Sequence, residues 1–245
     1  MIRVAIAGAN GRMGREAVAA VSAESDMELV AKIVRGDSLR NALASSRPDV
    51  LVDLTTPEFV FANALACLDA GVRPVIGATG LSPEQVETLS DACANLSLGG
   101  LIAPNFAIGA LLMMRFAADA ARYFPDVEIV EMHHEKKVDA PSGTALKTAR
   151  MIADARVGTP ISAPAGAFQS APGARGGKGA GDIPVHSIRL PGYVASQEVV
   201  FGGSGQRLSL RHDSLDRASF MPGVLLAVRK VVDLTTLIHG LENVL

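Results

Sequence analysis

The regular alternation of short apolar runs with helical patterns over residues 1–104 constrains the fold of this chain more than any other feature. The runs are rich in Val, Ile, Leu and Ala and are apolar on both faces, as strands are when helices cover both sides of a parallel sheet. Strands that alternate with helices of this length form βαβ units. The predicted strands are Arg3–Ala7, Met27–Val34, Asp49–Leu54, Arg73–Ile76 and Gly100–Ala103, and the predicted helices are Arg15–Ser25, Leu39–Ser45, Pro57–Ala70 and a segment that follows Ser82.

Three of these helix boundaries carry specific signals. Pro57 is suited to the first turn of its helix, where a missing N–H costs nothing. Gly71 follows the same helix at the position where a left-handed residue ends many helices. Ser82, Pro83 and Gln85 together predict an N-cap, a first helical residue and the reciprocal partner of a capping box.

The pattern changes after residue 104. A helix is predicted at Ala107–Tyr123, a strand at Val127–His133 and a second helix at Ala145–Ala155. Residues 158–182 are rich in Gly, Ala and Pro and predict a long loop, which in a compact domain is often functional. Strands joined by short turns follow, which indicates an α+β domain with a mixed or antiparallel sheet. These strands are His186–Leu190, Gln197–Phe201 and Arg207–His212, and a last helix covers Met221–Val232.

Three glycines lie between the first strand and the first helix, in the sequence GANGRMG. Gly8 permits a tight turn, Gly11 lets the backbone approach a pyrophosphate, and Gly14 lets the helix pack closely on the strand. A plain glycine-rich turn would contain the same residues, and the spacing departs by one residue from G-x-G-x-x-G. Because the loop joins a strand to a helix, we predict a Rossmann-like dinucleotide site, with phosphates at the helix N-terminus. Its other loop residues are Asn10, Arg12 and Met13.

Rossmann ligands bind outside the carboxyl ends of the strands. Three more loops satisfy this condition, namely Thr55–Thr56, Gly77–Gly80 and Ala103–Phe106. Each alone is ordinary turn chemistry, but three at successive strand ends favour contact with the nicotinamide side of a cofactor.

The end of the second strand bears on the choice between NADH and NADPH. NAD-preferring domains place an acid there to bind the ribose 2′-hydroxyl, whereas this strand ends at Val34, near Lys32 and Arg35. An arginine can bind a 2′-phosphate through two hydrogen bonds. Asp37 is the one nearby acid and would be the ribose ligand if the loop shifted. We expect NADPH to be used at least as well as NADH, with Arg35 at the 2′-phosphate.

The segment EMHHEKKVDAPSGTA, residues 131–145, contains two adjacent histidines in a chain that has five. Strand periodicity puts His133 and His134 on opposite faces, so both reach one ligand only if the strand ends there. Ser142 is a plausible N-cap, and the helix start with Lys137 offers N–H groups and a cation for a carboxylate. A histidine near its ordinary pKa is a natural proton donor. The spacing does not favour a metal site.

Two of these motifs, GANGRMG and EMHHEKKVDAPSGTA, together with the late segment RHDSLDRASFMPGVLLAVR, resemble the dihydrodipicolinate reductase family over essentially the whole chain. The resemblance implies reduction of 4-hydroxy-tetrahydrodipicolinate by NADPH or NADH in lysine and diaminopimelate biosynthesis. It implies a dinucleotide-binding domain at residues 1–104 and 216–245, and a substrate-binding domain at residues 105–215 that assembles a homotetramer through its sheets.

The resemblance also implies roles for single residues. His133 would be the general acid. His134 and Lys137 would hold or polarise the dicarboxylate, and Lys137 would also assist proton delivery. The other substrate-binding residues implied are Ser142, Gly143 and Thr144, the cofactor-side residues are Gly77, Thr79, Gly80, Pro104, Asn105 and Phe106, and the hinge arginine is Arg217. The chain departs from the family after LPGYVA, where Ser196 stands in place of an expected histidine.

Composition narrows the alternatives. A formal net charge of −2 gives no bulk attraction to nucleic acid or an anionic membrane, and no apolar run is long enough to cross a bilayer. Cys67 and Cys93 lie outside any CxxC, which predicts reduced buried thiols in a cytoplasmic protein. A dinucleotide-sensing regulator would need an output module such as a helix-turn-helix or a basic face, and the sequence indicates neither. A homoserine or sugar dehydrogenase would lack the histidine pair followed by K-x-D-x-P-S-G-T.

Overall fold

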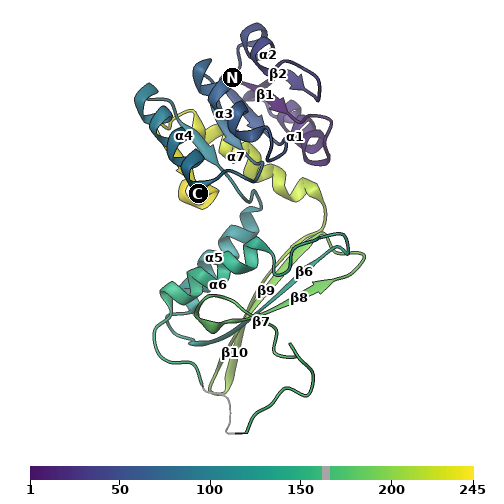
Figure 1. Ribbon diagram of the computed structural model, residues 1–245, viewed down its shortest axis with the longest axis vertical. Helices are drawn as coiled ribbons and strands as arrows, with labels where there is room; N and C mark the ends of the chain where they lie inside the picture. Colours follow the sequence, from purple (N-terminus) through teal and green to yellow (C-terminus); the bar gives the residue numbers. More distant parts are fainter. Residues whose placement is uncertain (162–165) are drawn as a thin grey trace. The chain divides into compact units, whose positions relative to one another are not determined.

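A computed structural model describes residues 1–161 and 166–245. These residues form two units, one of Met1–Ile108 with Arg217–Leu245 and one of Gly109–Asp216 (Figure 1). The chain therefore leaves the first unit once and returns to it for its last segment.

The sheet of the first unit is parallel throughout its described strands. Its order is β11-β5-β4-β3-β1-β2, so the chain starts in the interior of the sheet. After β2 is added on one side of β1, the following strands β3, β4 and β5 are added on the other side. The strands that it contains are β1 (Ile2–Ala7), β2 (Met27–Ile33), β3 (Val50–Asp53), β4 (Arg73–Ile76), β5 (Gly100–Ile102) and β11 (Leu237–His239). This is the Rossmann-like parallel sheet that the sequence predicts.

Helices cover both faces of this sheet, which explains why its strands are apolar on both sides. On one face α1 packs against α7, and α7 also contacts the central strands. On the other face α2, α3 and α4 follow one another (Figure 1). Their bounds are α1 (Arg12–Ala23), α2 (Leu39–Ser46), α3 (Val60–Asp69), α4 (Pro83–Leu96) and α7 (Met221–Val231). The fully buried side chains of β1, β3 and β4 form the centre of the core.

The predicted capping box of α4 is confirmed. The Ser82 hydroxyl accepts a hydrogen bond from the Gln85 backbone N–H, and the Gln85 side chain accepts one from the Ser82 N–H. Gly71 has a φ of +72° directly after α3, as predicted for a residue that ends a helix.

Two predicted helix starts are wrong. The first helix begins at Arg12 rather than Arg15, because Gly14 is already helical and lies against the backbone of Gly8. The third begins at Val60, and Pro57 lies in a turn ahead of it. In that turn the carbonyl oxygen of Thr56 accepts hydrogen bonds from two successive N–H groups, Phe59 and Val60.

The last strand of the first sheet was not predicted from the sequence. β11 pairs with β5 in parallel at the edge of the sheet, and the 3-10 turn η3 (Leu241–Val244) follows it. A run of three residues gives no usable periodicity, and its pairing depends on a strand that lies more than a hundred positions earlier in the chain.

The second unit contains a mixed sheet in the order β10-β9-β6-β8-β7. β6 and β8 are parallel, while the remaining described pairs are antiparallel. One face contacts helices, since α6 packs on β6 and β8, and Gly109 of α5 lies against His212. The elements are α5 (Ile108–Ala120), β6 (Asp126–His133), α6 (Gly143–Ala155), β7 (Gly177–Lys178), η1 (Ala180–Asp182), β8 (Pro184–Arg189), β9 (Ala195–Gly203) and β10 (Gln206–Ser214). The 3-10 helix η2 (Arg217–Phe220) follows them and belongs to the returning segment of the first unit.

The predicted loop at residues 158–182 is only partly correct. Residues 162–165 of that prediction lie outside the described residues. Toward the end of the segment, β7 adds to the edge of the sheet beside β8, and η1 packs on α6. These elements could not be predicted from the sequence, because a glycine-rich segment lacks the alternation of apolar and polar side chains that indicates a strand.

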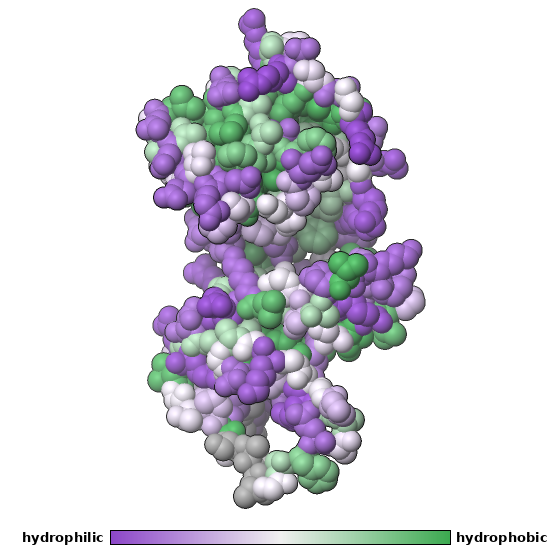
Figure 2. Space-filling view, viewed as in Figure 1, coloured by the Kyte–Doolittle hydropathy of each residue, from purple (hydrophilic) through white to green (hydrophobic). Residues whose placement is uncertain are grey.

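Both cysteines are free and buried, one of them in each of two apolar clusters on the α3 side of the sheet. Burial raises the pKa of Cys93 to about 11. Among the described helices, none is both long and apolar enough to span a bilayer. In the space-filling view, apolar side chains gather in the middle of the visible face of the first unit, with hydrophilic ones around them (Figure 2).

Candidate active site

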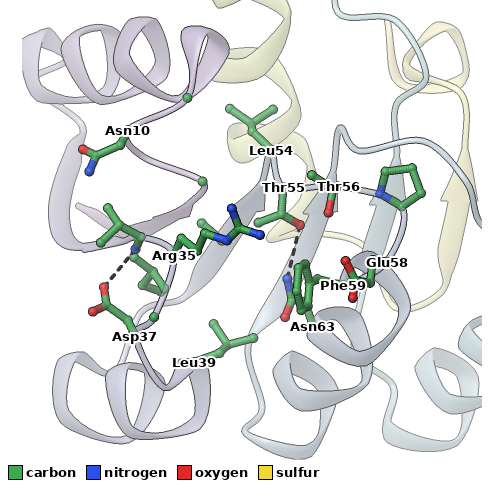
Figure 3. Close-up of a pocket in the computed structure, with 17 residues that line it drawn as sticks. Asn10, Arg35, Asp37, Leu39, Leu54, Thr55, Thr56, Glu58, Phe59 and Asn63 are labelled. Carbon is green, nitrogen blue, oxygen red and sulfur yellow. Dashed lines mark hydrogen bonds between the residues drawn. The ribbon is translucent and has the colours of Figure 1, made fainter.

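A pocket of about 730 Å³ lies at the carboxyl ends of β1, β2 and β3 in the first unit (Figure 3). This volume is in the range of small-molecule and cofactor sites. Of the cofactor residues predicted from the glycine loop and the second strand, the pocket is lined by Gly8, Asn10, Gly11 and Arg35. The loop after β3 and the start of α3 form its opposite wall, including the apolar side chains of Leu54 and Phe59.

The glycine loop is shaped for close approach of a ligand and of its own backbone. A Cβ atom at Gly8, which has a φ of +78°, would lie 2.7 Å from the Leu54 carbonyl oxygen. A Cβ atom at Gly14 would lie 2.1 Å from the Gly8 carbonyl oxygen. Gly11 is the N-cap of α1, and no side chain caps that helix. The N–H groups of its first turn therefore face the loop, as a bound pyrophosphate requires.

A buried carboxylate supports the opposite wall of the pocket. Asp53, which is 1% exposed, accepts hydrogen bonds from the Thr55 N–H at 2.8 Å and from the Thr55 hydroxyl at 2.5 Å. Its second oxygen accepts one from the Asn63 amide at 2.9 Å. Thr55 and Asn63 both line the pocket and point toward each other in Figure 3. The sequence indicated Thr55 but not Asp53 or Asn63.

The turn after β2 holds the two residues that bear on cofactor choice. Asp37 accepts a hydrogen bond from the Val34 N–H at 2.9 Å, and its own N–H donates to the Val34 carbonyl. Its carboxylate therefore closes the turn. The Arg35 side chain is exposed and extends toward the loop that contains Thr55 (Figure 3). Both Arg35 and Asp37 line the pocket.

The remaining predicted cofactor residues lie outside this pocket. The loops after β3, β4 and β5 nevertheless contact one another, because a Cβ atom at Gly77 would meet the side chains of Phe106 at 2.5 Å and of Leu54 at 2.7 Å. The predicted residues that do not line the pocket are Arg12, Met13, Gly14, Gly77, Thr79, Gly80, Pro104, Asn105 and Phe106.

In the second unit, the histidine pair lies at the end of β6, since that strand ends at His133. The Nδ1 atom of His133 is 2.5 Å from a carboxylate oxygen of Glu131. Arg189 of β8 binds both oxygens of the same carboxylate, at 2.9 and 2.7 Å. The sequence did not point to Glu131 or Arg189 as site residues.

Burial and neighbouring charges have opposite effects on the pKa values of His133 and Glu131. Burial, the largest effect, lowers the pKa of His133, while the Glu131 carboxylate works against it. Burial raises the pKa of Glu131, but hydrogen bonds from Arg189, Ser187 and His133 outweigh burial and hold that pKa below its usual range. Glu131 is therefore an anion at neutral pH, with its side chain fully buried.

The start of α6 joins the same group. Ser142 is its N-cap, with the hydroxyl accepting from the Ala145 N–H as predicted, and the Ser142 N–H donates to Glu131 at 3.2 Å. Because the helix begins at Gly143, the N–H groups of Gly143 and Thr144 have no intrahelical acceptor. They can bind an anion such as a carboxylate.

Lys137 has its ammonium 2.6 Å from Asp139 in the loop before α6. Only 22% of its side chain is exposed, so this ion pair is partly shielded from water. His134 is partly buried and opens a turn, its carbonyl accepting from the Lys137 N–H. A substrate carboxylate would have to share Lys137 with Asp139.

Two further predicted positions lie elsewhere. Ser196 is buried, and its hydroxyl binds Asp213 of β10. Arg217 begins η2, the first element of the returning segment of the first unit. Among the described residues, no group of three or more His, Cys, Asp or Glu side chains is arranged to hold a metal ion.

A parallel sheet with helices on both faces, a glycine turn at a helix N-terminus and a pocket at the strand ends define a Rossmann-type dinucleotide-binding protein. Residues 2–106 match the family described as dihydrodipicolinate reductase, N-terminus, and residues 109–245 match dihydrodipicolinate reductase, C-terminus. The chain belongs to the dihydrodipicolinate reductase family, whose members are pyridine-nucleotide-dependent reductases.

Curated relatives resemble the chain over its full length. The 4-hydroxy-tetrahydrodipicolinate reductase of Geobacillus thermodenitrificans is 51% identical, with 100% of this chain and 99% of that protein covered. The enzyme of the same name from Coxiella burnetii is 50% identical over the same shares. The dipicolinate-bound dihydrodipicolinate reductase of Paenisporosarcina sp. TG-14 superimposes with a TM-score of 0.91 at 45% identity, covering all of both chains.

Proposed function

We propose that this chain catalyses the NAD(P)H-dependent reduction of 4-hydroxy-tetrahydrodipicolinate to tetrahydrodipicolinate in lysine and diaminopimelate biosynthesis. The observation that carries the proposal is the identity of about half of all residues, over the full length, to relatives of that name. We place this chemistry in the cytoplasm, as the sequence predicts.

The reaction consumes one hydride and one proton and releases one water. Loss of the 4-hydroxyl group as water leaves a cyclic imine with a conjugated double bond and two carboxylates. A bound nicotinamide would supply the hydride for reduction of this conjugated system, and an acid of the protein would supply the proton that completes it. The protein has to bind a dianion, exclude water and place a proton donor beside the ring.

The group around His133 supports the proposal, because it combines hydrogen-bond donors, positive charge and a titratable ring. His133 is the proposed proton donor, because it is the titratable side chain held at the end of β6 beside the start of α6. Lys137 and the N–H groups of Gly143 and Thr144 supply positive charge and donors for a substrate carboxylate, with Ser142 fixing that helix end. His134 follows in the same loop and is assigned to the dicarboxylate.

The first-unit pocket is the proposed cofactor site. A Cβ atom at Gly8, Gly11 or Gly14 would lie 3.0 Å or less from a backbone oxygen of the protein, so these glycines permit the tight turn that would bring a pyrophosphate to the start of α1. We propose that NADPH is used at least as well as NADH, because Arg35 extends along the pocket wall while the Asp37 carboxylate is engaged in closing its own turn. An arginine suits a 2′-phosphate, and an engaged acid is a poorer ligand for a ribose hydroxyl.

We propose in addition that the chain assembles a homotetramer through the sheet of the second unit. Helices α5 and α6 lie on one face of that sheet. The strand parity places Val130, Ile188 and Val200, all partly exposed, on the opposite face. Sedimentation of the purified protein tests this, and a monomer at assay concentrations would exclude it.

A coupled assay tests the main proposal. The product of pyruvate and aspartate semialdehyde condensation is generated in the cuvette, and oxidation of NADPH or NADH is followed by absorbance on adding this protein. We expect oxidation that depends on both the condensation product and the protein. Failure to oxidise either cofactor, with binding of both verified by calorimetry, would refute the assigned substrate.

A further inference from the structure

The carboxylate of Glu131 accepts hydrogen bonds from several groups of the second unit at once. Its side chain is fully buried on the helix-facing side of β6. Arg189 binds it through two hydrogen bonds, the Ser142 N–H donates to it, and it is 2.5 Å from Nδ1 of His133. Ser187 donates to it as well. A charge buried this deeply persists only when its lone pairs are satisfied.

These contacts determine which nitrogen of His133 carries a proton when the ring is neutral. An ionised carboxylate only accepts hydrogen bonds, so the Nδ1 atom facing Glu131 must be the donor. The Nε2 atom is then the remaining ring nitrogen, and 14% of the side chain is exposed. A ring fixed in this way can present only Nε2 to a substrate.

Arg189 does more than neutralise the carboxylate. The same guanidinium group donates to the carbonyl of Asp139 at 2.7 Å, in the loop that leads to α6. Glu131 and Arg189 therefore connect the ring of His133, the loop that carries Lys137 and the first turn of α6.

We propose that Glu131 and Arg189 form a positioning pair that fixes the proton of His133 on Nδ1, presents Nε2 to the substrate, and sets the acidity of the ring by opposed charges. The proposal rests on the proposed role of His133 as proton donor. Neither member of the pair needs to touch the substrate.

The opposed charges make the proposal distinguishable from a purely structural ion pair. The charged groups near His133 are Glu131 on β6, Arg189 on β8, and Lys137 with Asp139 in the following loop. The carboxylate favours the protonated ring and the guanidinium opposes it. Removing each member should therefore move the pH profile in opposite directions, whereas loss of a structural tie moves both variants alike.

Glu131→Gln is the first test, because the amide keeps the volume and removes the charge. We expect kcat to fall by about 10²-fold, the lower end of what a general acid contributes. Binding of NADPH and of pyridine-2,6-dicarboxylate should change by less than about threefold, since neither needs the ring proton. The descending limb of kcat/KM, where activity is lost as the acid deprotonates, should shift to lower pH.

Arg189→Met is the second test. It removes the positive charge that opposes protonation of His133, so the pKa of the ring should rise and the descending limb of the kcat/KM profile should shift to higher pH. Glu128→Gln is the matched control. Glu128 lies on the same strand and pairs with a histidine and an arginine, His186 and Arg175, but it lies on the other face. That variant should leave the limb unchanged, with sedimentation verifying its assembly.

Nitrogen-15 NMR of the histidine rings supplies a readout independent of activity and of the variants' stability. In the wild-type protein, above its pKa, His133 should carry its proton on Nδ1. In Glu131→Gln the proton should move toward Nε2, while the control variant changes only the His186 signals.

A wild-type ring protonated on Nε2 would overturn the proposal even if neither variant folds. Shifts of the pH limb in the same direction for Glu131→Gln and Arg189→Met would also overturn it. Absence of reductase activity in the wild type would instead count against the proposed function. The tautomer measurement would still test the positioning pair, because it does not depend on activity.

Discussion

Arg35→Ala tests the proposed preference for NADPH with a small perturbation. Arg35 is exposed and lines the pocket at the end of β2. A charge-assisted hydrogen bond is worth about 1.5–3 kcal/mol, and exposure to solvent favours the lower half of this range. At about 1.4 kcal/mol per tenfold, the affinity for NADPH should fall by about 10- to 40-fold, and that for NADH by less than about twofold.

The assay is kcat/KM and calorimetric affinity for both cofactors in the wild type and the variant. Lys32→Ala is the matched control, since Lys32 is an exposed cation on β2, the strand that precedes Arg35, and does not line the pocket. It should leave the ratio of the two cofactors unchanged. Because Arg35 is exposed, its loss should change the free energy of unfolding by no more than about 0.5 kcal/mol.

Asp37→Asn separates the two candidate ribose contacts. The amide oxygen can still accept the hydrogen bond from Val34, so the turn should persist. Removing the negative charge should favour NADPH slightly. A strong preference of the wild type for NADH, with a selective loss of NADH in this variant, would refute the predicted preference and assign the ribose to Asp37. Equal losses of both cofactors in Arg35→Ala would show that Arg35 does not contact the 2′-phosphate.

The remaining predictions concern the second unit and the glycine loop. His133→Gln should lower kcat by about 10²–10⁴-fold with cofactor affinity retained, and near-normal kcat would remove it from the acid role. Because burial lowers the pKa of His133, wild-type kcat/KM should already decline as pH rises through a value below the ordinary histidine range. Lys137→Ala should weaken pyridine-2,6-dicarboxylate binding by about 10- to 150-fold, measured by calorimetry. Gly14→Ala should destabilise the protein in urea by about 1–3 kcal/mol, because its Cβ would lie 2.1 Å from a carbonyl oxygen, whereas Gly143→Ala, with nothing within 4 Å, should be nearly neutral.

The parallel sheet was predictable because its signals are local. Each strand is a short apolar run, and the helices between them carry caps such as Ser82. What the sequence did not reveal depends on distant pairing. β11 is three residues long and is a strand only because it lies beside β5, and β7 is defined by β8 in a glycine-rich segment.

The site was predictable in part for the same reason. His133, Lys137 and Ser142 lie within ten positions of one another, so one motif contains them. Arg189 lies 58 positions after Glu131, and only the parallel pairing of β6 and β8 brings them together. A signal for Glu131 was nevertheless present, since it shares the buried parity of Val127 and Ile129. A charged residue on an apolar face requires a partner.

Both candidate sites depend on a buried carboxylate at or near the end of a strand. Asp53 is the last residue of β3 and holds Thr55 and Asn63 by three hydrogen bonds, while Glu131 holds His133 and the start of α6. Burying an acid is costly unless donors surround it, so each carboxylate fixes several donors at once. A hydrophobic residue in either place would cost less to bury but would leave the polar groups around it free to rotate. The buried acids therefore hold the polar groups of both sites in fixed positions beside strands that are otherwise apolar.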